Sequence, residues 1–104
     1  MTDALYALEK LGQAVNALAT GAGRVQERLG KAAICLVSAR PDDIPDEDLR
    51  RGFVGVKDDL AFEPAQGSEG MIAATMRVTG DEDASRIASR ILDLYLELRH
   101  RLLR

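Results

Sequence analysis

The strongest hydrophobic pattern in the chain covers residues 4–36. Apolar or small residues recur there at alternating steps of four and three, namely at Ala4, Leu8, Leu11, Val15, Leu18, Ala22, Val25, Leu29, Ala32 and Leu36. This is the a/d spacing of a heptad repeat, which places one apolar seam along one side of a helix. The pattern predicts one long helix over residues 3 to about 39. Its interaction seam is formed by Leu8, Leu11, Val15, Leu18, Val25 and Leu29.

Two glycines, Gly21 and Gly23, lie in the middle of this segment. Each costs about 1 kcal/mol relative to alanine inside a helix. A turn normally resets the hydrophobic phase, whereas here the apolar and polar faces keep their phase across both glycines. We therefore favour a continuous helix that bends at this point. The alternative is a break that folds the chain into a self-sufficient monomer.

The rest of the chain also carries helical patterns. Pro41 stops the first helix, and a second helix starts near Pro45 with three acids in its first turn, where they face the positive end of the helix dipole. Its seam is Leu49, Phe53, Val56 and Leu60, and a loop with Pro64, Gly67 and Gly70 follows. A short third helix runs through Met71, Ile72, Met76 and Val78. A long C-terminal helix has its seam at Ala84, Ala88, Ile91, Tyr95, Leu98 and Leu102.

No segment alternates with the period of a strand, so the predicted fold is all-α. We expect residues 1–104 to form a single helical-bundle domain of about four helices: a long N-terminal helix, two shorter middle helices and a long C-terminal helix. A helix over residues 3–39 would be about 55 Å long, and the shorter helices cannot cover its whole seam. We therefore expect a homodimer that completes the bundle.

The composition of the chain indicates which kinds of partner and which cellular compartment to expect. The net charge of −3 argues against a nucleic-acid partner, because phosphate neutralisation supplies most non-specific affinity. One cysteine and one histidine exclude an internal disulfide framework and a standard structural zinc site. The first ten residues lack a signal-peptide pattern, and the longest apolar run, residues 32–37, is too short to span a bilayer. We expect a cytoplasmic protein with no membrane association.

One acidic motif is a candidate metal site. The stretch from Asp42 through Asp46 matches DDxxD, with which isoprenoid synthases hold magnesium and a diphosphate, so Asp42, Asp43 and Asp46 are the candidate metal ligands. Pro45 interrupts the motif, however, and no second acidic motif stands on a comparable helix. We interpret these acids as helix-start residues and expect no metal or cofactor.

Two further groups of charged residues indicate alternative functions. Acids across residues 42–59, including Asp58 and Asp59, could join a small-ligand or metal-dependent enzyme site across a subunit interface. Arg99, His100, Arg101 and Arg104 form a basic patch that could dock an acidic partner, or DNA if the protein is a DNA-associated regulator.

The sequence shows no set of residues with the types and spacing of a known catalytic site. Cys35 lies in an apolar run and is best interpreted as a packed thiol, because the only histidine, His100, is near the other end of the chain. The sequence leaves enzyme activity undecided but favours its absence. The leading hypothesis is a small, self-associating helical interaction or adaptor module with an unknown protein partner.

Overall fold

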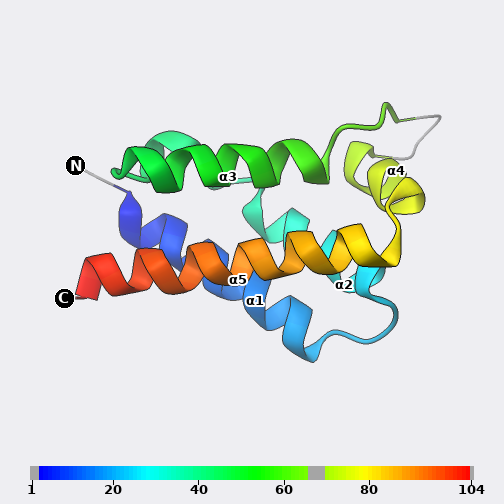
Figure 1. Ribbon diagram of the computed structural model, residues 1–104, viewed down its shortest axis with the longest axis horizontal. Coiled ribbons are helices and arrows are strands. Elements are labelled where there is room, and N and C mark those ends of the chain that lie inside the picture. Colours follow the sequence, from blue (N-terminus) through cyan, green and yellow to red (C-terminus); the bar gives the residue numbers. More distant parts are fainter. Residues whose placement is uncertain (1–2, 66–69, 104) are drawn as a thin grey trace.

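The computed structural model describes residues 3–65 and 70–103, and within these ranges the chain is helical with no strand (Figure 1). The helices are α1 (Ala4–Thr20), α2 (Val25–Leu36), α3 (Glu47–Leu60), α4 (Met71–Val78) and α5 (Asp81–Leu103), with a short 3-10 helix, η1 (Pro41–Asp43), before α3. The prediction of an all-α chain is confirmed. None of the described helices is both long enough and apolar enough to cross a membrane.

The N-terminal segment forms two helices, so the prediction of one continuous helix over residues 3–39 is wrong. The chain reverses at Gly23, whose φ of 93° lies in a region that side-chain-bearing residues rarely adopt. Arg28 closes the turn by donating hydrogen bonds to the carbonyl oxygens of Leu18 (2.9 Å) and Gly23 (3.3 Å). The turn between Thr20 and Val25 has about as many residues as one helical turn. The hydrophobic phase therefore continues across a real break.

The helices α1 and α2 pack against each other as an antiparallel pair. Tyr6 near the start of α1 donates a hydrogen bond to Ser38 just beyond α2 (2.8 Å), while Arg28 joins the opposite ends of the two helices. Of the predicted seam, Leu11 and Leu29 are fully buried, and the partly buried members are Leu8, Val15, Leu18 and Val25. Because this pairing covers the seam within one chain, the helix-length argument for a homodimer no longer holds, and the homodimer stays a prediction.

The helix α5 runs along both α1 and α3 (Figure 1). It is antiparallel to α3, since Arg101 near its end reaches Asp48 at the start of α3 and Arg90 reaches Asp59 near the end of α3. Close approach depends on glycine at Gly52, where a Cβ atom would lie 3.2 Å from Leu94 Cδ2.

The core contains the predicted seam of α3 and half of the predicted seam of α5. All four seam residues of α3 are buried, and Phe53 is the largest fully buried side chain. Of the predicted seam of α5, Ala84, Ile91 and Leu98 are buried, and the partly buried members are Ala88, Tyr95 and Leu102. Ile87, outside that seam, is also buried. Full burial of one leucine, isoleucine or phenylalanine side chain contributes about 1.5–3 kcal/mol. These contacts fix α3 and α5 relative to the α1–α2 pair, with α4 set beside α2.

Candidate functional site

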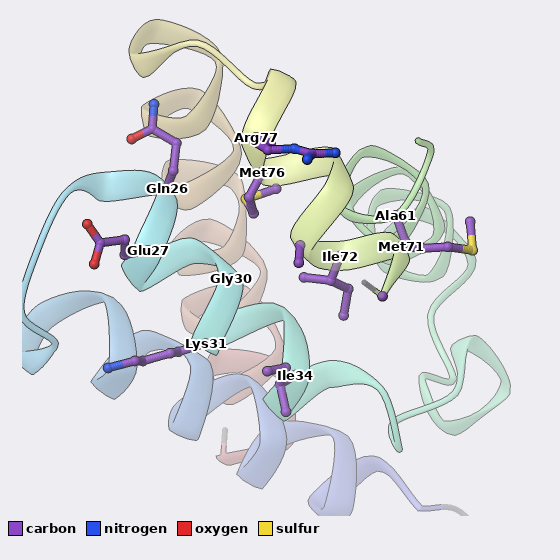
Figure 2. A pocket seen from close by; sticks show the side chains of 12 residues that line it. Gln26, Glu27, Gly30, Lys31, Ile34, Ala61, Met71, Ile72, Met76 and Arg77 are labelled. Atoms are coloured by element: carbon purple, nitrogen blue, oxygen red, sulfur yellow. The ribbon is translucent and has the colours of Figure 1, made fainter. Parts of the chain in front are cut away.

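A groove between α2 and α4 has a volume of about 950 Å³ (Figure 2). We call it the α2–α4 groove. One wall carries Gln26, Glu27, Gly30, Lys31 and Ile34 of α2, and the other carries Met71, Ile72, Ala73, Met76 and Arg77 of α4, with Ala61 and Gly70 completing it. Most of these side chains are apolar, so the groove offers a water-exposed hydrophobic surface.

Small residues make the space. Gly30 has no side chain, and a Cβ atom there would lie 3.6 Å from Met76 Cγ. Met76 reaches in between the two helices, while Glu27 and Lys31 point away from α4 (Figure 2). Ile34 is 66% exposed and Met71 is 48% exposed, although both are large and apolar. Exposing such large apolar side chains costs hydrophobic free energy unless a partner covers them.

The buried hydroxyl of Thr75 holds α4 in place. It accepts hydrogen bonds from the backbone N–H groups of Phe62 (3.0 Å) and Glu63 (2.9 Å), which follow the end of α3. Thr79 in turn donates to the Thr75 carbonyl oxygen (2.7 Å) and closes the end of α4. The Thr75 side chain therefore anchors the α4 wall of the groove to the segment that follows α3.

A polar cluster fixes the start of α2 at the end of the groove. The Gln26 amide donates to Asp81 Oδ1 (2.6 Å) and to the Thr79 carbonyl oxygen (3.2 Å), and Arg24 forms an ion pair with Asp81 (3.0 Å). Hydrogen bonds from Gln26 and Arg24 lower the pKa of Asp81. The cluster joins residues that are more than 50 positions apart, and it commits the amide nitrogen of Gln26 to the fold.

The three candidate metal ligands have different surroundings. Asp43 is buried, and its carboxylate accepts the backbone N–H of Arg40 (3.0 Å) at the start of η1. Asp46 accepts a hydrogen bond from Arg101 (3.1 Å), whereas Asp42 is exposed. A search of the described residues finds no group of three or more His, Cys, Asp or Glu side chains placed to hold a metal ion. The structure thus gives Asp43 and Asp46 partners within the fold.

Near Asp43, a half-buried amine also holds the connection between α2 and α3. Lys57 Nζ donates to the Ala39 carbonyl oxygen (2.7 Å) and lies 5.4 Å from the centre of the Phe53 ring. Partial burial lowers the pKa of Lys57, and the nearby negative charge of Asp43 opposes this change. Of the other acids in residues 42–59, Asp59 forms an ion pair with Arg90 (2.6 Å).

The predicted basic patch is divided by the structure. Arg101 turns towards α3 and forms ion pairs with Asp48 (2.8 Å), Asp46 (3.1 Å) and Glu97 (2.9 Å). The hydrogen bond from Arg101 lowers the pKa of Asp48 from its ordinary 3.8 to about 2. Arg99 and His100 are exposed, and Arg104 lies outside the described residues. Three members of the patch are therefore placed, and one of them is engaged in ion pairs within the fold.

Sequence reasoning missed the α2–α4 groove. The sequence contains one indication of this groove. Ile34 lies outside the heptad seam and is therefore expected on an exposed face of α2. Cys35, beside it, is partly buried against the core, in line with a packed thiol. Comparison with protein-family models, curated proteins and solved structures finds no match to this chain.

Proposed function

We propose that the chain is a small helical interaction module that holds an apolar helix of a partner protein in the α2–α4 groove. The observation that carries this proposal is the groove itself, with Ile34 and Met71 exposed on its two walls. Amphipathic helices bind such grooves through side chains at positions i, i+3, i+4 and i+7. Flexible methionines, here Met71 and Met76, adapt their shape to different apolar partners.

A helix suits this groove better than a small molecule does. Small-molecule sites usually combine an apolar pocket with a few polar groups that fix the ligand's orientation. The amide nitrogen of Gln26 already serves Thr79 and Asp81, and Glu27 and Lys31 point away from α4 (Figure 2). Arg77 of α4 also lines the groove, and the rest of the lining is largely hydrophobic, so it discriminates mainly by shape.

Selection from a displayed library of helical peptides tests this function. The library keeps an apolar stripe at positions i, i+3, i+4 and i+7 and varies all other positions. We expect enrichment on the wild-type chain and loss of binding on Ile34→Glu, because the partner would bury an unpaired carboxylate. Val54→Glu, on exposed α3 surface outside the groove, is the matched control and keeps binding. Equal recovery on wild type and Ile34→Glu would refute a role for the groove.

We also propose that the module self-associates as a homodimer in the cytoplasm. Support comes from exposed leucines on α5, which lie outside the α2–α4 groove. Size-exclusion chromatography with light scattering tests this part of the proposal. A mass of one chain, 11.3 kDa, at high micromolar concentration would refute it.

A further inference from the structure

We infer that an exposed leucine stripe on α5 is the homodimer interface, and that it pairs antiparallel with the same stripe of a second copy. The inference rests on the proposed self-association and names its surface. Leu92, Leu96 and Leu103 are 42%, 50% and 63% exposed. They belong to a second heptad pattern on α5, at Ser85, Ser89, Leu92, Leu96, Arg99 and Leu103, all of which are exposed. This leucine stripe is separate from the seam that faces the core.

The leucine stripe lies beside a hollow that can receive a side chain. This hollow, of about 250 Å³, is lined by Val15, Leu18 and Ala19 of α1 and by Ala88, Ser89 and Leu92 of α5. In coiled-coil packing, an apolar knob from one helix enters a hole on its neighbour. Leu103 is the most exposed leucine of the stripe, so its side chain can act as such a knob.

An antiparallel arrangement brings each knob to a hollow. With the two-fold axis passing between Glu97 and Leu98, Leu92 lies opposite the partner's Leu103. The partner's Leu103 then reaches the hollow beside Leu92, and the symmetry repeats this contact at the other end. Leu96 lies opposite the partner's Arg99, whose aliphatic stem can cover it while the guanidinium stays in water.

Charge favours the same arrangement. Asp93 and His100 are seven residues apart and so lie on one flank of the leucine stripe. Antiparallel pairing places Asp93 near the partner's His100 and the partner's Arg99, and does so twice. Parallel pairing would instead place Arg99 against the partner's Arg99, and like charges at such positions destabilise. Among the described residues of this half of α5, Glu97 and Arg101 are paired with each other on the α3 side.

This complementarity identifies a second copy as the occupant. One helix supplies the knob, part of the hollow, and both the acid and the bases that flank the stripe. The paired segment from Leu92 to Leu103 is only about 18 Å long. Since standard interfaces bury about 800 Å² per partner, we expect a dimer that dissociates on dilution.

Sedimentation equilibrium over a range of concentrations tests the surface. We expect Leu96→Lys and Leu103→Glu each to raise the dimer dissociation constant about tenfold or more, because the first places a second cation against the partner's Arg99 and the second puts a carboxylate into the apolar hollow. Asp93→Lys should weaken the dimer, and Asp93→Lys combined with His100→Glu and Arg99→Glu should restore it. Far-UV circular dichroism and thermal midpoints like those of wild type show that each variant is folded. Val54→Glu, on α3, is the matched control with unchanged association.

Disulfide crosslinking tests the orientation. In a Cys35→Ala background, an equimolar mixture of Leu92→Cys and Leu103→Cys chains should form a mixed disulfide on oxidation. Neither variant alone should crosslink, because antiparallel pairing keeps equivalent residues apart. A disulfide between two Leu92→Cys chains would overturn the antiparallel interface.

The outcomes separate this inference from the function on which it rests. A wild-type chain that stays monomeric at high micromolar concentration would refute both self-association and the interface. A wild-type dimer that survives Leu96→Lys and Leu103→Glu but dissociates with Ile34→Glu would refute the α5 interface. That result would leave self-association standing, with the α2–α4 groove as its surface.

Discussion

Replacing Gly23 with alanine should destabilise the fold, and the sign of this effect separates a turn from a continuous helix. The φ of Gly23 is 93°, and holding an alanine in this region costs about 1–2 kcal/mol. In a continuous helix the same substitution would instead stabilise by about 1 kcal/mol. The two structures therefore predict opposite changes in the free energy of unfolding.

A steric contribution adds to the cost. A Cβ atom on residue 23 would lie 2.6 Å from Glu27 Oε2. The carboxylate can move aside, but it then weakens its hydrogen bond with the backbone N–H of Arg24 (3.3 Å), which stabilises the first turn of α2. In a domain of about this size, 1 kcal/mol shifts the thermal midpoint by about 4–8 °C. We expect Gly23→Ala to lower the midpoint by about 5–15 °C.

Urea denaturation monitored by circular dichroism, at one low protein concentration, measures the change. Gly30→Ala is the matched control, because Gly30 is inside α2 and its added methyl would make an ordinary contact 3.6 Å from Met76. That control should stabilise by about 0.5–1 kcal/mol. If Gly23→Ala unfolds at a higher urea concentration than wild type, the turn between α1 and α2 is wrong.

Two further substitutions probe the polar contacts. Thr75→Val keeps the side-chain shape but leaves the N–H groups of Phe62 and Glu63 without their acceptor. We expect it to lower the free energy of unfolding, measured by urea denaturation, by about 1–3 kcal/mol. Thr75→Ser keeps the hydroxyl and should keep most of the stability. Asp48 has its pKa lowered to about 2 by Arg101, so its charge stabilises the fold above pH 3.8 and this contribution disappears as the pH falls towards 2. Arg101→Gln should flatten that part of the stability–pH curve, and an unchanged curve would contradict the assignment.

The later helices could be predicted from the sequence because their signals are local. Leu49, Phe53, Val56 and Leu60 repeat with helical spacing between a proline-rich connection and a glycine-rich loop, and all four are buried. The segment containing Gly23 was misread for a physical reason. A turn of nearly one helical repeat leaves the hydrophobic phase unchanged, so periodicity alone does not reveal it.

The α2–α4 groove could not be predicted, because long-range contacts position its walls. Thr75 binds the segment after α3, and Gln26 binds Asp81 at the start of α5. Periodicity says which face of a helix is apolar, but not which helix will cover that face. Ile34 and Leu96 both lie off the core seams. Only the positions of the neighbouring helices show that no other element of the described chain covers them.

Arginines of α5 form ion pairs with several acids of residues 42–59. Asp46 and Asp48 share Arg101, and Asp59 binds Arg90. A cation would have to compete with these guanidinium groups for the carboxylates. The acids therefore have a role in attaching α3 to α5, which the sequence motif alone did not reveal.

The two proposed surfaces have a joint consequence. The leucine stripe of α5 and the α2–α4 groove share no residue, so a dimer formed through α5 would leave both grooves open. Two linked grooves bind a bivalent partner more tightly than one groove does, because the second contact becomes intramolecular. Leu96→Lys, which faces the partner's Arg99, would then weaken binding of a bivalent partner while leaving the affinity for a single helix unchanged. A weak dimer can in this way strengthen recognition of a partner that carries two helices.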